Sequence, residues 1–170
     1  MPCTTLGHGV VVLTTGGRTE QFTMKERPDL PPACFVQMGD FLRYALDEAV
    51  AQGLRQVVIG GMVGKLTKIA QGETITHANR AEVDTELLAQ LAASLGAPPA
   101  DCAAIAAAEP ARFAAERMEA LGLSAPFHTA LSRAVVRTLR APARYGGQFQ
   151  LHVLVCDFDG RKVAEAFSHD

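Results

Sequence analysis

Short apolar runs alternate with amphipathic stretches along this chain, and the alternation predicts strands and helices in turn. Three β-branched runs, over residues 9–15, 34–38 and 56–60, predict buried strands that end at or beside glycine. A fourth strand is predicted over residues 149–155, where apolar and polar side chains alternate. A tight turn over 157–160 and a weak last strand follow it. The chain therefore carries enough strands for one sheet.

Apolar residues recur at helical spacing between these strands. The predicted helical segments are residues 40–52 with Asp40 as N-cap, residues 65–70, a helix with apolar residues at 83, 87, 91 and 95, and the alanine-rich stretch 101–141. Strands that alternate with helices are typical of an α/β fold. We therefore predict a mainly parallel sheet with flanking helices, and an alanine-rich helical segment before the last strand.

Composition narrows the class of protein. The 170 residues are 48% hydrophobic, which suits a single domain over residues 1–170. The net charge of -2 gives no overall field that favours nucleic acid or an anionic membrane. No apolar run is long enough for a bilayer, and residues 1–8 lack the features of a signal peptide. We expect a cytoplasmic protein without nucleic-acid or membrane partners.

The four cysteines, Cys3, Cys34, Cys102 and Cys156, lie far apart, and no two of them form a CxxC pair. Disulfide frameworks are typical of short, cysteine-dense secreted chains, and structural zinc sites use closely spaced ligand pairs. We therefore expect reduced thiols and no metal site.

Polar segments that contain glycine follow three of the predicted strands. They are residues 14–20, 38–40 and 60–65. The carboxyl ends of parallel strands meet at one edge of a sheet, and ligands of open α/β sheets bind beyond that edge. The three segments are therefore expected to converge on one rim and to form a ligand site.

The segment 60–67 is similar in composition to a phosphate-binding P-loop. Its spacing differs, because Gly60 and Gly64 enclose three residues instead of four and Leu66 follows Lys65. A glycine-rich turn that opens a helix still suits an anion, and Lys65 and Lys68 are expected on one exposed face of that helix. An anion or cofactor contact and a purely structural turn both stay open here.

Two further polar groups have a functional and a structural interpretation. Residues 157–160, Asp-Phe-Asp-Gly, resemble the opening motif of haloacid-dehalogenase phosphatases, but too little chain follows for the partner groups of that motif. A tight turn is favoured. His77 is either a base or hydrogen-bond donor to a substrate carboxylate, or a solvated loop residue.

Several blocks occur together in a fixed order: residues 11–20, 35–41, 61–70, 76–77 and 155–160. In that order they resemble the carboxyl-terminal half of the cobalt-precorrin-5B C1-methyltransferase (CbiD) family, over nearly the whole chain from Gly9. The resemblance implies methyl transfer from S-adenosylmethionine to ring carbon C-1 of a cobalt corrinoid in anaerobic cobalamin biosynthesis. Family members carry a long region before these blocks. The resemblance therefore also implies an amino-terminal partner polypeptide or self-association.

The resemblance and the expected rim together assign candidate roles. The candidate donor-binding residues are Thr15, Gly16, Gly17, Gly39, Asp40, Gly61 and Gly64. The candidate substrate-binding residues are Arg18, Lys65, Lys68, His77 and Arg80, because cations there would pair with the acetate and propionate groups of the corrinoid. No catalytic base and no metal ligand is assigned. The alternatives are a noncatalytic corrinoid-binding or assembly module and, more weakly, a small nucleotide- or phosphate-binding protein.

Overall fold

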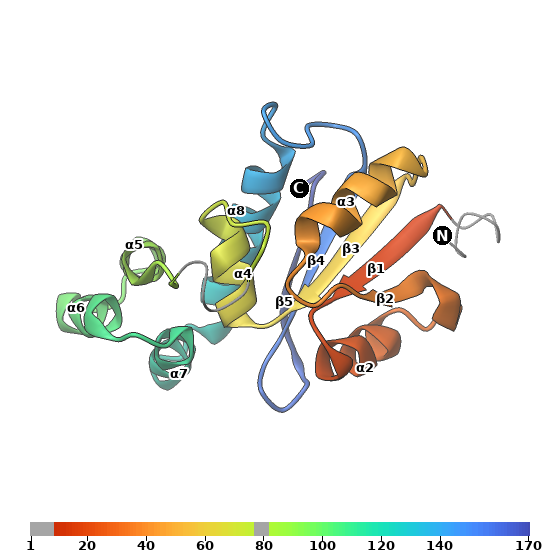
Figure 1. Ribbon diagram of the computed structural model, residues 1–170. Coiled ribbons are helices and arrows are strands. Elements are labelled where there is room, and N and C mark those ends of the chain that lie inside the picture. Colours follow the sequence, from red (N-terminus) through yellow and green to blue (C-terminus); the bar gives the residue numbers. More distant parts are fainter. Residues whose placement is uncertain (1–8, 77–81) are drawn as a thin grey trace.

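The computed structural model describes residues 9–76 and 82–170 (Figure 1). Its elements, in chain order, are β1 (Val10–Thr14), α2 (Gly17–Glu26), the short 3-10 helix η1 (Pro32–Cys34), β2 (Phe35–Gln37), α3 (Leu42–Ala51), β3 (Gln56–Gly61), α4 (Val63–Ala70), α5 (Thr85–Ser94), α6 (Pro99–Ala107), α7 (Ala111–Ala120), α8 (Ser124–Arg140), β4 (Gln150–Cys156) and β5 (Lys162–Phe167).

The strands form one sheet in the order β2-β1-β3-β4-β5. The first four strands run parallel, and β5 pairs antiparallel with β4. The α/β class and the mainly parallel sheet are therefore confirmed. The last strand is antiparallel because the turn after β4 is too short for the crossover that a parallel partner needs.

Helices cover both faces of the sheet. On one face α3, α4 and α8 pack against the strands, and Leu42 and Leu66 join Leu13 in the larger core cluster. On the other face α2 contributes Phe22 to a smaller cluster with Val12. Successive β1 residues therefore point into two different cores, which explains why the strand is a continuous apolar run instead of an alternating one.

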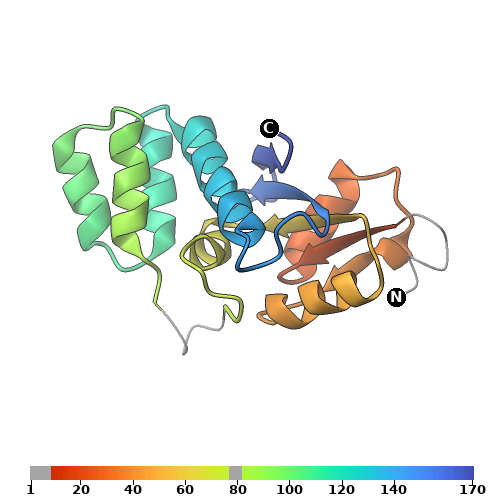
Figure 2. The same ribbon diagram turned by 90° about the horizontal axis from the view of Figure 1, so that it is seen from above.

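The predicted helix with apolar residues at 83, 87, 91 and 95 corresponds to α5, and the alanine-rich stretch 101–141 covers most of α6 and all of α7 and α8. Helices α5, α6 and α7 lie side by side beyond α8, away from the sheet (Figure 2). Ala89, Ala92 and Ala114 are buried in this region. Small side chains let helices approach closely, so the composition follows from the packing. The predicted helical segment before the last strands is confirmed.

Three local expectations are wrong. Helix α2 was not predicted, because its sequence is polar and Phe22 is its only large buried side chain. Asp40 does not cap α3: Phe41 occupies the N-cap position, without a side-chain hydrogen bond. Helix α4 begins at Val63 instead of Lys65.

The expectation of reduced cysteines holds for two of the described residues and fails for a third. Cys102 and Cys156 are free, whereas Cys34 is disulfide-bonded. Cys3 lies outside the described residues. Within residues 9–76 and 82–170, no helix combines the length and hydropathy that a membrane span needs.

Candidate functional site

The carboxyl ends of the four parallel strands form the edge at which the glycine-containing segments meet. The register pairs Thr14 of β1 with Gln37 of β2 and Gly60 of β3, so these strands end together. Beyond β1 the chain enters α2 on one face of the sheet, and beyond β3 it enters α4 on the opposite face. Adjacent strands whose helices leave in opposite directions form a switch point, where open α/β sheets bind ligands.

The β1 side of the switch point is built around the hydroxyl of Thr19. The backbone N–H groups of Thr15 and Gly16 both donate to Thr19 Oγ1, each at 3.1 Å, and this hydroxyl donates to the Gly16 carbonyl at 3.0 Å. A Cβ added to Gly16 or Gly17 would meet no atom within 4 Å. The first turn of α2 therefore begins beside open space, with its N–H groups at the sheet edge, an arrangement that suits an anion or a polar ligand.

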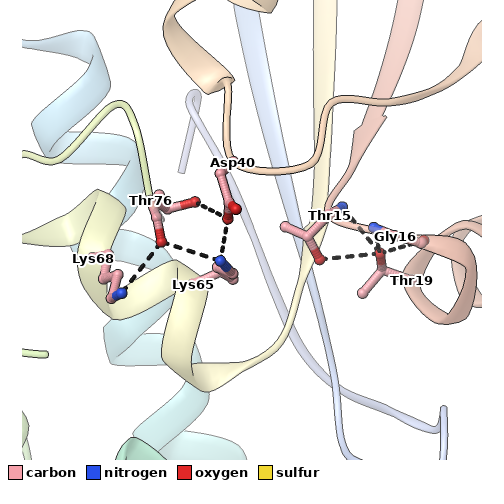
Figure 3. A network of polar contacts seen from close by, with 7 residues as sticks. All are labelled: Thr15, Gly16, Thr19, Asp40, Lys65, Lys68 and Thr76. Carbon is pink, nitrogen blue, oxygen red and sulfur yellow. Dashed lines mark hydrogen bonds and ion pairs between the residues drawn. The ribbon is translucent and has the colours of Figure 1, made fainter. Parts of the chain in front are cut away.

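The opposite side of the switch point carries a polar network that joins three segments (Figure 3). The ammonium group of Lys65 pairs with Asp40 Oδ1 and donates to the Thr76 carbonyl at 3.1 Å. Thr76 Oγ1 donates to the same Asp40 oxygen at 3.1 Å, and the Thr76 N–H donates to the Asp40 carbonyl at 2.9 Å. Asp40 therefore fixes the loop before α3 to α4 and to the segment that follows α4.

Lys68 belongs to the same network but is not an exposed residue. It is 7% exposed, and its ammonium group donates to the Thr76 carbonyl at 3.2 Å. The expectation of two exposed lysines is therefore wrong for Lys68, whereas the Lys65 side chain is about one-third exposed. Both lysines nevertheless donate to the same Thr76 carbonyl oxygen, because their three-residue spacing places them on one side of α4.

The glycines of this edge have different structural reasons. Gly39 has φ 57°, a left-handed conformation that favours glycine. A Cβ on Gly60 would lie 2.2 Å from Thr23 Cγ2, so close packing requires glycine there. A Cβ on Gly61 would lie 3.0 Å from Leu66 Cδ2, a tight contact that a small shift of Leu66 would relieve. A Cβ on Gly64 would meet nothing within 4 Å. Gly64 therefore opens the N-terminus of α4 as Gly16 and Gly17 open that of α2.

The turn after β4 completes the edge. Asp157 Oδ1 accepts the N–H groups of Asp159 and Arg161, each at 2.9 Å, as in an Asx turn. Partial burial alone would raise the pKa of Asp157, but the backbone N–H groups of Arg161 and Asp159, together with the Arg161 guanidinium, lower that pKa overall. The carboxylate is therefore bound within its own turn, which agrees with the turn interpretation and not with a nucleophile.

Two residues of the edge were missed by the sequence analysis. Phe158, in the turn after β4, and Arg112, in the first turn of α7, stack with the guanidinium carbon 4.4 Å from the ring centroid. The carboxyl-end rule alone would have included Phe158, because it follows a predicted strand. No local pattern indicates Arg112, since its position depends on how α7 packs beside α4.

The remaining candidates lie apart from the network or outside the described residues. Arg18 is exposed on the first turn of α2 and reaches the Phe158 carbonyl at 3.5 Å. It therefore lies on the β4 side of the edge. His77 and Arg80 fall outside the described residues.

Comparison with known proteins places this architecture in a family. The family described as "CbiD, C-terminal domain" matches residues 75–167 of this chain. The cobalt-precorrin-5B C(1)-methyltransferase of Paracidovorax citrulli is 82% identical over 164 residues, which cover 96% of this chain and 44% of that protein. The proteins of the same name from Methylococcus capsulatus and Salinispora tropica are 64% and 42% identical, over 96% and 93% of this chain and 42% and 41% of their own lengths.

The chain thus spans less than half the length of these curated relatives. No solved structure matches it. The family description covers more than half of the chain, and the order of the sequence blocks points to the same group. The chain therefore belongs to the CbiD family.

Proposed function

We propose that this chain supplies the carboxyl-terminal part of an S-adenosylmethionine-dependent methyltransferase that acts on C-1 of cobalt-precorrin-5B, with the cytoplasm as its compartment. The observation that carries the proposal is the 82% identity, over 96% of the chain, to a protein of that name. The structure contributes a second argument, since an open switch point lies at the edge where doubly wound sheets bind their ligands.

The residues on the β1 side fit the methyl donor. S-adenosylmethionine supplies an electrophilic methyl group on a sulfonium, and its carboxylate and hydroxyl groups need N–H donors and oxygen acceptors. The first-turn amides of α2 and the Thr15 hydroxyl offer such partners, and Gly16 and Gly17 leave room for them. Gly39, Gly61 and Gly64 shape the neighbouring backbone in this proposal. Binding of the donor here orients its methyl group beyond the sheet edge, which is the main requirement of a transfer reaction.

The network on the other side fits a positioning role. Asp40 Oδ1 already accepts from Lys65 and Thr76, so in this proposal Asp40 holds the two segments and does not act as a base. Lys65, Lys68 and Arg18 bring positive charge to the rim, where acetate and propionate groups of the corrinoid would pair with it. His77 and Arg80 complete this proposed set.

A noncatalytic corrinoid-binding or assembly module is the second candidate. The observation that favours it is the coverage of only 44% of the most similar relative reported above, which leaves more than half of that protein without a counterpart here. In this alternative the chain holds the corrinoid and another polypeptide, or a second copy, supplies the rest of the transferase.

Transfer of a labelled methyl group from S-adenosylmethionine to cobalt-precorrin-5B tests the proposal. The chain is assayed alone and with the separately produced amino-terminal part of the Paracidovorax citrulli relative. Calorimetry with S-adenosylhomocysteine and with a corrinoid accompanies the assay. Label transfer in either reaction supports the methyltransferase. If the chain binds the corrinoid but neither transfers the label nor binds S-adenosylhomocysteine, the result supports the noncatalytic module. If label transfer, S-adenosylhomocysteine binding and corrinoid binding are all absent, both candidates are overturned.

A further inference from the structure

A groove lies beside the start of α4, at the carboxyl edge of the sheet. Its volume is about 330 Å³, and it runs between the first turns of α4 and α7 and the turn after β4. Met62, Val83, Ala111 and Phe158 give it apolar walls, while Lys68 and Arg112 are among its cations. A cavity of this size accommodates part of a large ligand but not a whole tetrapyrrole.

Arg112 is suited to hold a carboxylate at this groove. Its guanidinium lies over the Phe158 ring, and its Nε donates to Glu116 at 2.6 Å, so that hydrogen bond does not use the terminal nitrogens. The side chain is 60% exposed. A planar guanidinium that is fixed by an aromatic ring and by one acidic neighbour presents a fork for a second carboxylate.

Lys68 adds a second, independent indication of an anion. Within the described residues its ammonium group donates to one carbonyl oxygen and takes part in no ion pair, although it is 7% exposed. A carbonyl satisfies one of its three N–H groups and leaves two for a further acceptor. Buried charges in proteins are normally paired, so a carboxylate bound in the groove would pair with this ammonium group.

We propose that this groove binds a carboxylate-bearing edge of the corrinoid, with Arg112 and Lys68 as the pairing cations and Phe158 and Met62 as the apolar contact. The assignment rests on the proposed function. It places the corrinoid edge on one side of Gly64 and the donor on the other, since Gly64 lines the groove and also opens the start of α4. The two reactants then lie at the same sheet edge, as methyl transfer requires.

The test compares two arginines of the same helix. Arg112→Gln removes the proposed contact. Arg117→Gln is the matched control, because Arg117 also lies over an aromatic ring, that of Phe113 at 5.3 Å, and pairs with an acid, Asp101 at 3.4 Å, but does not line the groove. The probes are cobyrinic acid, whose side chains are carboxylates, cobinamide, whose side chains are neutral amides, and S-adenosylhomocysteine. Dissociation constants are measured by calorimetry, after thermal melts show that both variants fold.

We expect Arg112→Gln to weaken the binding of cobyrinic acid about tenfold, which is the effect of losing one charge-assisted hydrogen bond. Cobinamide and S-adenosylhomocysteine should bind this variant as they bind the wild type, and Arg117→Gln should change none of the three. Equal loss with cobinamide would contradict carboxylate recognition, and a loss confined to S-adenosylhomocysteine would assign the carboxylate to the donor instead. If Arg112→Gln binds cobyrinic acid as tightly as the wild type does, the binding role of the groove is overturned and the proposed function is not. Failure of the wild type to bind any probe would overturn the proposed function as well.

Discussion

The contact between β3 and α2 yields a sharp prediction, because one missing methyl group decides how closely they pack. A Cβ on Gly60 would lie 2.2 Å from Thr23 Cγ2, well inside any ordinary contact. Thr23 is fully buried, and its hydroxyl donates to the carbonyls of Thr19 and Glu20, each at 3.0 Å. The side chain is therefore held in one rotamer and cannot turn away without breaking these bonds.

Gly60→Ala must consequently push α2 from the sheet by about 1 Å, and we expect a loss of about 3 kcal/mol in the free energy of unfolding, the upper end for overpacking. Thr23→Ser removes only the clashing methyl group and keeps the hydroxyl, so alone it should cost about 1 kcal/mol. The other atoms near the new Cβ lie at 3.7 and 3.8 Å, which is ordinary contact. The double variant should therefore be no less stable than Thr23→Ser alone.

Urea unfolding followed by circular dichroism measures this cycle, and calorimetry with S-adenosylhomocysteine measures its consequence at the site. Displacement of α2 in Gly60→Ala should weaken the binding of S-adenosylhomocysteine, and the double variant should restore this binding. Gly61→Ala is the control, since its new Cβ meets the flexible end of Leu66 at 3.0 Å and should cost about 1 kcal/mol. Simple additivity of the Gly60 and Thr23 effects would refute the reasoning, because it would show that these two groups do not clash.

Three further outcomes are expected. Gly64→Ala should raise the free energy of unfolding measured in urea by about 0.5 kcal/mol, since alanine favours the helix. The same variant should weaken corrinoid or donor-product binding severalfold by calorimetry, and unchanged binding would show that Gly64 has no role in the site. Asp40→Asn and Lys65→Met should each lower the free energy of unfolding by about 1–2 kcal/mol in the same assay, because the pair is half-buried and shares Thr76. The double variant should show a coupling energy of about 1 kcal/mol, and zero coupling would contradict the network. Burial lowers the pKa of His152 below its ordinary 6.5, although the hydrogen bond to Glu165 opposes this shift. As the pH falls below 6.5, the unfolded chain therefore takes up the proton before the folded chain does, and the folded state loses stability. His152→Gln should make this loss shallower in pH-dependent melts, and an identical slope would rule out the assignment.

The sequence predicts the sheet well because buried parallel strands have a local signature. Residues 10–13 and 57–61 are unbroken apolar runs, and strands covered on both faces require such runs. The convergence of the glycine-containing segments then follows from topology alone, as parallel strands share one carboxyl edge. Helix α2 has no comparable signature. Its polar side chains face solvent, and Thr19 and Thr23 use their hydroxyls on the backbone, so a narrow buried stripe around Phe22 carries the packing.

The contents of the site are less predictable than its place. Lys68 is expected to be solvated by residue type, and its burial depends on the segment 71–76, whose Thr76 carbonyl accepts from its ammonium group. Arg112 meets Phe158 only because α7 packs beside the turn after β4, a relation between parts of the chain far apart in sequence. Local patterns contain neither fact, since both depend on how elements are placed relative to one another.

The glycines of the carboxyl edge separate what folding requires from what binding requires. Gly39 needs its positive φ, and Gly60 and Gly61 are held by close neighbours, so folding alone explains them. Gly16, Gly17 and Gly64 have neither reason, because none has a positive φ and a Cβ on each would meet open space. Glycine within a helix costs about 0.5–1 kcal/mol relative to alanine, a cost that Gly17 and Gly64 incur without a structural return. In the proposed function, these three glycines leave the backbone open at the switch point so that the ligand can approach it closely.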